Sequence, residues 1–137
     1  MILAAGLTPA WQQIMRFEKL QLGEVNRAAE VHWCASGKVL NAGMALATLG
    51  VPCHTLSPLG GWSGAAIRSE FTERQNPAAW VMTGAPTRIC TTILVDGGPT
   101  TELVENAAAL TAAEYAAFRA DYAPLARQAE DQPSYDP

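Results

Sequence analysis

The sequence predicts an α/β fold, and three observations carry this prediction. Short apolar segments alternate along the chain with segments of helical periodicity, which is typical of parallel sheets covered by helices. A two-residue alternation marks a β-hairpin near residues 88–105, and a capping box opens a last helix near residue 111. The chain has 137 residues, 49% hydrophobic and 16% charged, which is enough to bury a core.

The first half is expected to contain three strands and two helices. The strands are residues 2–6, 28–34 and 51–57, and the helices are residues 37–49 and 63–74. Residues 11–22 fit either a helix or extended chain, and their context favours extended chain. Ser36 is expected to be the N-cap of the first helix, and Gly50 is expected to end it.

The second half continues with a short strand at residues 79–82, a hairpin and a helix. Apolar residues alternate with polar ones from Ile89 to Val95, Asp96-Gly97-Gly98 provides a turn, and residues 100–105 return. The last helix begins with the pair Thr111 and Glu114, and Pro124 is expected to kink it. Residues 130–137 are polar and contain two prolines, which predicts a frayed tail.

Composition excludes several classes of function. The net charge of −4 and the pI of about 5.0 argue against general binding to nucleic acid or to a membrane surface. No segment approaches the length of a membrane span, and the N-terminus lacks the basic start of a signal peptide. We therefore expect a cytoplasmic protein.

Three cysteines, Cys34, Cys53 and Cys90, form no Cys-x-x-Cys pair and are expected to be reduced thiols. A zinc site built from two of them with His32 and His54 is not expected. Cys53 and His54 are adjacent in a predicted strand, so their side chains would point to opposite faces.

The run from Cys34 to Asn41 leads from a predicted strand into a predicted helix and contains Gly37 and Lys38. Free N–H groups at a helix start, with a glycine and a lysine, suit an anionic or hydroxyl-rich ligand. A nucleotide-binding P-loop does not fit, because it needs a glycine where His32 stands and a Ser or Thr where Val39 stands. The alternative is an ordinary strand-to-helix turn with a solvated lysine.

Seven motifs within residues 1–129, taken in order and spacing, carry a resemblance to one family. They are residues 7–12 (Leu-Thr-Pro-Ala-Trp-Gln), 23–27 (Gly-Glu-Val-Asn-Arg), 35–41 (Ala-Ser-Gly-Lys-Val-Leu-Asn), 46–51, 59–64, 87–88 (Thr-Arg) and 101–105 (Thr-Glu-Leu-Val-Glu). Together they resemble the N-terminal half of PfkB-type, ribokinase-like carbohydrate kinases, in particular the 1-phosphofructokinase and tagatose-6-phosphate kinase branch.

The resemblance implies a three-layer α/β/α domain over residues 1–129, with a small β-lid formed by residues 11–34 and 86–105. It implies ATP-dependent phosphorylation of a sugar phosphate, with ATP and Mg²⁺ bound mainly outside this chain. It also implies a possible homodimer through the lid. Lids of this kind exclude water, so that the phosphoryl group passes to the sugar.

The same resemblance implies a set of substrate-binding residues. Lys38 and Asn41 would bind the sugar, and Arg27 and Arg88 would converge on its phosphate over the loop at residues 36–41. The remaining members are Gln12, Ser36, Gly37 and Glu102. Several of these residues also have a structural interpretation. Asn41 would be an amide on the helix surface, Arg27 and Arg88 would be exposed strand arginines, and Glu102 would be a solvated hairpin carboxylate.

Several residues depart from the family pattern. Gln12 stands in place of an Asp, Ser36 and Val39 in place of glycines, Met44 in place of an Arg, and Cys90 in place of an Asn. These departures leave the predicted fold unchanged and bear on the identity of the substrate.

The chain also contains no Gly-x-Gly-Asp, the family motif that supplies the general base. We therefore expect a catalytically incomplete portion of a sugar-phosphate kinase. One alternative is a non-catalytic sugar-binding or lid-mediated dimerisation module. A nucleoside or ribose kinase relative is a weaker alternative, because the two arginines favour a phosphorylated substrate. The isolated chain is expected to be poorly folded or associated, because its parallel sheet would end on an uncovered strand.

Overall fold

The structure is a computed structural model that describes residues 1–131. The expected tail at residues 130–137 falls mostly outside the described residues. Its first two residues, 130 and 131, are the last turn of a helix rather than a tail.

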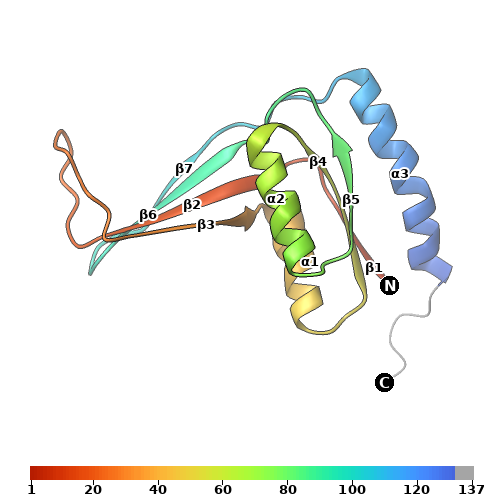
Figure 1. Cartoon of the computed structure of the whole chain (residues 1–137), viewed down its shortest axis with the longest axis horizontal. Coiled ribbons are helices and arrows are strands. Elements are labelled where there is room, and N and C mark those ends of the chain that lie inside the picture. The colour runs from red at the N-terminus through yellow and green to blue at the C-terminus, as the bar shows by residue number, and fades with distance from the viewer. Residues whose placement is uncertain (132–137) are drawn as a thin grey trace.

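The body of the molecule is a three-stranded parallel sheet with helices on both faces (Figure 1). Its strands, in spatial order, are β1 (Ile2–Ala5), β4 (Cys53–Leu59) and β5 (Ala78–Met82). One face is covered by α1 (Lys38–Thr48) and α2 (Gly61–Glu73), and the other by α3 (Ala112–Asp131). The predicted three-layer α/β/α arrangement is therefore confirmed.

A second sheet of four strands projects from the body (Figure 1). Its strands, in spatial order, are β3 (Glu30–Ser36), β2 (Ala10–Phe17), β6 (Ile89–Val95) and β7 (Thr101–Val104). The hairpin of β6 and β7 is confirmed, and the ambiguous residues 11–22 begin as extended chain. β2 runs antiparallel to β3 and parallel to β6, so it lies inside this sheet. The segments expected to form the lid thus form one sheet.

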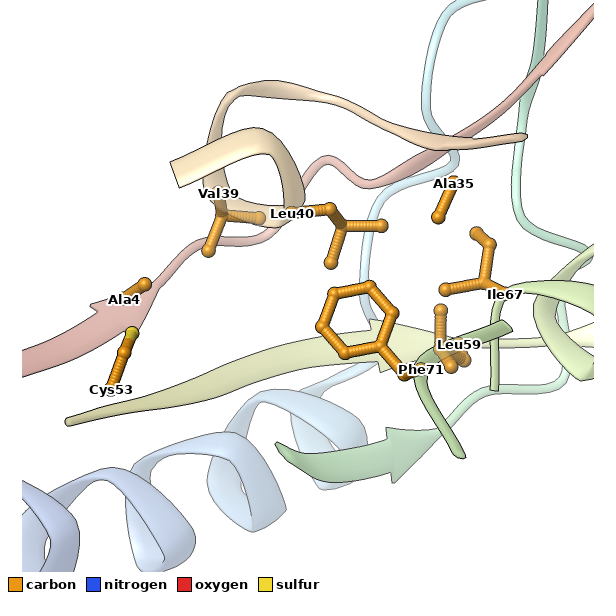
Figure 2. Packing of buried hydrophobic residues seen from close by; sticks show 8 residues of the cluster. All are labelled: Ala4, Ala35, Val39, Leu40, Cys53, Leu59, Ile67 and Phe71. Carbon is orange, nitrogen blue, oxygen red and sulfur yellow. The ribbon is translucent and has the colours of Figure 1, made fainter. Parts of the chain in front are cut away.

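The core between the body sheet and helices α1 and α2 is apolar and closely packed (Figure 2). Leu40 from α1, Leu59 from β4, and Ile67 and Phe71 from α2 are all at most 1% exposed. Phe71 also meets Trp80 of β5 edge-on, with ring centroids 5.1 Å apart. Burial of such side chains stabilises the fold by roughly 1.5–3 kcal/mol each.

The opposite face of the sheet packs against α3 through Leu56, Val81 and Phe118. The capping box of α3 is confirmed: the Thr111 N–H donates to the Glu114 carboxylate at 2.8 Å, and the Glu114 N–H donates to Thr111 Oγ1 at 3.2 Å. The helix continues through Pro124 to its last turn.

The start of α1 differs from the prediction. Ser36 is not the N-cap, because it is the last residue of β3; Gly37 takes the N-cap position, and no side chain caps the helix. The predicted helix end is confirmed, since Gly50 has a φ of 72° just past α1 and donates its N–H to the Ala47 carbonyl at 3.0 Å.

Candidate functional site

The candidate site lies where the second sheet meets the first turn of α1. Gly37 adopts a φ of 96°, and a Cβ atom there would stand 2.9 Å from the Thr8 carbonyl oxygen. Only glycine accepts both that backbone conformation and that close approach. The turn between β1 and β2, which contains Thr8 and Pro9, is therefore pressed against the start of α1.

The first turn of α1 offers N–H groups to an anion. Lys38 is the first residue of the helix and is exposed, and the Asn41 N–H donates to the Gly37 carbonyl at 2.9 Å, which begins the helical bonds. The turn contains no acidic residue and no side-chain cap. The exposed Asn41 side chain follows one turn later. These features leave the helix N-terminus open to a negatively charged group.

Arg88 adjoins this helix start. Its half-buried side chain donates to three carbonyl oxygens: Nη2 to Thr8 at 3.2 Å, Nε to Pro9 at 3.3 Å and Nη1 to Glu105 at 3.3 Å. The Thr8 carbonyl oxygen that accepts this hydrogen bond from Arg88 is the same oxygen that lies close to Gly37. A guanidinium carries five N–H groups, so two remain for another acceptor. Arg88 thus ties the β1–β2 turn to the second sheet beside the first turn of α1.

A row of polar side chains crosses one face of the second sheet. Gln12 Nε2 donates to Thr92 Oγ1 at 2.5 Å, and the Thr92 hydroxyl contacts both Glu102 carboxylate oxygens at 2.8 and 3.0 Å. Strand pairing aligns Gln12 with Cys90 and Thr92 with Glu102, so all four share this face. Thr92 was not among the predicted site residues, although the alternation of the hairpin placed it on the face of Cys90.

Arg27 lies apart from the other predicted residues. It is exposed in the loop between β2 and β3, beyond the pair of Arg16 with Glu30. Ser36 pairs with Ala10 at the other end of the same two strands, six residues away, or roughly 20 Å at 3.3 Å per residue. The expected convergence of Arg27 and Arg88 within one chain is therefore wrong, because β3 separates Arg27 from the helix start.

An ion-pair cluster joins strand ends at this far end of the second sheet. Arg16 contacts Glu30 at 3.0 Å and Asp96 at 2.7 Å, and these two carboxylates raise the pKa of the Arg16 guanidinium. Arg16 therefore stays charged and links β2 to β3 and to the turn after β6. It is a structural arginine, since both its contacts lie within the sheet.

The Cys34 and Cys53 thiols and the His54 imidazole are not activated as nucleophiles or bases. Burial raises the pKa of the Cys34 thiol, with a further contribution from the charge of Glu70, and burial also raises that of Cys53. Burial lowers the pKa of His54, which favours the neutral ring. Among residues 1–131, no group of three or more His, Cys, Asp or Glu side chains could hold a metal ion.

The fold matches solved sugar kinases. Phosphofructokinase-2 from Escherichia coli, in complex with fructose-6-phosphate, matches with a TM-score of 0.82 and 21% identity, over 88% of this chain and 40% of its own. A candidate 1-phosphofructokinase from Thermotoga maritima matches with a TM-score of 0.81 and 22% identity, over the same shares of the two chains. A candidate ribokinase from Agrobacterium tumefaciens matches with a TM-score of 0.65 and 19% identity, over 84% of this chain and 41% of its own. No family model matches the sequence.

The chain therefore has part of the ribokinase-like fold, as its motifs predicted. It spans about 40% of the length of the solved structures it matches. In the part of the chain that the structure describes, no helix is both long enough and apolar enough to cross a membrane.

Proposed function

We propose that this chain is the sugar-binding portion of an ATP-dependent sugar-phosphate kinase and is catalytically incomplete by itself. The observation that carries the proposal is the position of Arg88. It is held by the Thr8 and Pro9 carbonyls beside Gly37 and the first turn of α1, with two guanidinium N–H groups left over. A fold shared with phosphofructokinases supports the same substrate class.

In this proposal the phosphate of the substrate lies between Arg88 and the first turn of α1. Arginine suits a dianion because its planar fork makes two parallel charge-assisted bonds. The Ser36 hydroxyl, the Gly37 backbone and the Lys38 ammonium border the same helix start and contribute further donors. The helix dipole favours the negative charge.

The sugar hydroxyls would be held by the amides of Asn41 and Gln12. Each amide offers a donor and an acceptor, which suits neighbouring hydroxyls. The Gln12 amide is already oriented by its bond to Thr92, and Glu102 orients Thr92 in turn. The second sheet would act as the lid that keeps water from the reacting hydroxyl.

ATP and Mg²⁺, which the family resemblance implies, do not fit the residues described. Residues 1–131 provide no cluster of carboxylates for a metal ion, and the sequence has no Gly-x-Gly-Asp for the transferring phosphate. No catalytic step is therefore assigned to residues of this chain. We place the nucleotide site and the general base in a part of the kinase that this chain does not contain.

A non-catalytic module that pairs through the second sheet is the alternative. Large apolar side chains are exposed on its two outer strands: Val31 (49%) and Trp33 (38%) on β3, and Leu103 (54%) and Val104 (58%) on β7. Strand pairing puts Val31, Trp33 and Leu103 on one face of this sheet and Val104 on the other, and contiguous apolar surface on such a face is typical of interaction sites. A homodimer through this sheet is compatible with either function. Arg27, at the end of the sheet far from the body, would then lie near the contact between the two subunits rather than near the start of α1 in its own chain.

The test is the Arg88→Ala substitution in a longer protein that carries the missing part of the kinase. Two charge-assisted hydrogen bonds, worth roughly 1.5–3 kcal/mol each, would be lost. We expect the KM for the sugar phosphate to rise about ten- to a hundredfold, with the KM for ATP nearly unchanged.

The control variant is Arg68→Ala, at an exposed arginine of α2 outside the site, which should leave both constants unchanged. Because Arg88 also bonds three carbonyls, the melting temperature of each variant is measured alongside. An equal loss for both substrates, or no loss for either, would make Arg88 a structural residue of the sheet.

A further inference from the structure

A chain of side-chain hydrogen bonds on the second sheet fixes which way the Gln12 amide points. Gln12 lies on β2, Thr92 on β6 and Glu102 on β7, so the chain links three neighbouring strands. The Gln12 Nε2 atom lies 2.5 Å from Thr92 Oγ1, and Thr92 Oγ1 lies 2.8 and 3.0 Å from the two Glu102 carboxylate oxygens. The Thr92 hydroxyl is therefore the link between the amide and the carboxylate.

The direction of each bond in this chain follows from the carboxylate. A carboxylate only accepts hydrogen bonds, and a hydroxyl has one hydrogen to donate. Thr92 therefore gives its hydrogen to Glu102, and its oxygen can only accept from Gln12. The atom of Gln12 that faces Thr92 is then the amide nitrogen, because the carbonyl oxygen has no hydrogen to offer. Turning the amide over would place two oxygens face to face with no hydrogen between them.

The carbonyl oxygen of this fixed amide remains for a ligand. Among residues 1–131, the Gln12 oxygen takes part in no hydrogen bond, and no buried side-chain nitrogen or oxygen lacks a partner, so this oxygen is accessible. Gln12 lies two residues from Ala10, which pairs with Ser36 at the base of the sheet. Thr92 aligns with Ile14, on the side of Gln12 away from that base. The amide nitrogen is thus used away from the start of α1, and an acceptor remains beside the candidate site.

We propose that Thr92 and Glu102 are positioning residues that hold the Gln12 amide with its carbonyl oxygen available to the substrate, so that the site selects a group that donates a hydrogen bond, such as a sugar hydroxyl. An amide that can turn over would offer either its oxygen or its NH2 group, and would serve a donor and an acceptor equally. Held by Thr92, Gln12 offers its oxygen and only one remaining N–H. The identity of the ligand rests on the proposed function, whereas the direction of the amide rests on the hydrogen bonds alone.

The kinetic test uses the longer protein that carries the missing part of the kinase. Thr92→Val removes the hydroxyl and keeps the branched shape, and Thr91→Val is the matched control, because Thr91 lies next to Thr92 on the opposite face of β6. We expect Thr92→Val to raise the KM for the sugar phosphate about three- to tenfold, with kcat within about twofold of the wild type, as the loss of one hydrogen bond predicts. Thr91→Val should change neither constant, and Thr92→Ser, which keeps the hydroxyl, should retain the wild-type KM.

A double substitution shows whether Thr92 acts through Gln12. In a Gln12→Met background the side chain has a similar length and no amide, so Thr92→Val should cause no further rise in the KM for the sugar phosphate. A further rise of the same size as in the wild-type background would overturn the positioning role. Equal effects of Thr92→Val and Thr91→Val would overturn it as well.

The direction of the amide has a readout of its own, which needs no activity. In the longer protein with isotopically labelled glutamine, the NMR signal of the Gln12 side-chain amide is the one missing from Gln12→Met. We expect its hydrogens to exchange with solvent about three- to tenfold more slowly in the wild type than in Thr92→Val, and at the wild-type rate in Thr91→Val. Equal exchange in all three proteins would overturn the fixed amide. If exchange follows the expectation and Arg88→Ala leaves the KM for the sugar phosphate unchanged, the fixed amide stands and only the proposed function fails.

Discussion

At the scale of single residues, Gly37 decides how the candidate site is built. Its φ of 96° turns the chain from β3 into α1, and its missing side chain lets the Thr8 carbonyl come close. Arg88 bonds that same carbonyl. One glycine therefore brings the β1–β2 turn, the helix start and the arginine into one place.

Gly37→Ala is expected to destabilise the protein more than Gly23→Ala. Both glycines have a positive φ, 96° and 83°, so each alanine costs about 1–2 kcal/mol of backbone strain. Only at Gly37 would the new Cβ also meet backbone atoms, and such overpacking adds roughly 1–3 kcal/mol. Urea unfolding of the longer protein that carries the missing part of the kinase measures the difference in the free energy of unfolding. Equal losses would mean that the turn at Thr8 moves aside without cost.

At the scale of elements, α2 holds the second sheet against the body. The Glu70 carboxylate accepts the Ala35 N–H of β3 at 2.6 Å and the Arg74 Nε–H at 2.9 Å. Trp62 of α2 meets Trp33 of β3 edge-on, with ring centroids 6.3 Å apart. These contacts fix the base of the sheet that carries Gln12 and Arg88.

Glu70→Ala is expected to loosen this attachment. It leaves the Ala35 N–H without its partner, at a cost of about 1–3 kcal/mol. Faster amide exchange at Ala35 and altered tryptophan emission report the change. Glu73→Ala is the control, since among the residues that the structure describes Glu73 accepts only from the Ser69 hydroxyl on its own helix. If both variants leave Ala35 equally protected, α2 does not position the second sheet.

The start of α3 gives a prediction about pH. Backbone N–H groups of Thr111 and Gly84 donate to the Glu114 carboxylate and hold its pKa below the usual range. Because the folded pKa is the lower one, the stabilisation is present above the unfolded pKa of about 4.3 and is lost as pH falls through the folded pKa. Melting temperatures from pH 7 to 3 should show a smaller acid loss for Glu114→Gln than for the wild type. Glu130→Gln should behave like the wild type.

At the scale of the whole molecule, we propose that groups outside this chain complete the site for phosphoryl transfer. Transfer needs positioned donors for the moving phosphate and a base for the attacking hydroxyl, and the sequence has no Gly-x-Gly-Asp to provide them. Because β1 is an outer strand of the body sheet, we also expect the isolated chain to associate or to fold poorly. A sharp cooperative melt from a monomeric sample would contradict that expectation.

The purified 137-residue chain should show no ATP-dependent phosphorylation of fructose 1-phosphate, fructose 6-phosphate or tagatose 6-phosphate. A coupled ADP-release assay, on protein purified from a host without these kinases, measures this. Turnover above the background of a mock preparation would show that the chain holds a complete active site. If the longer protein that carries the missing part of the kinase is active instead, the missing groups lie in that part.

By itself the sequence determined the α/β class, the hairpin, the capping box of α3 and the helix that starts near Lys38. These features rest on local periodicity and on hydrogen bonds between residues a few positions apart, so a single chain displays them directly. The fold resemblance followed from the order and spacing of motifs for the same reason.

Only the tertiary structure decided how distant segments meet. The lateral pairing of β2 with β6, the bond from Gln12 to Thr92 and the contact of Arg88 with Thr8 all join residues about 80 positions apart. Two corrections have the same origin. Gly37 rather than Ser36 is the N-cap because Ser36 pairs with Ala10 as the last residue of β3. Arg27 lies far from Arg88 because the length of β3 separates Arg27 from the start of α1. No local pattern encodes such distances, because they depend on strand register and on which face each helix covers.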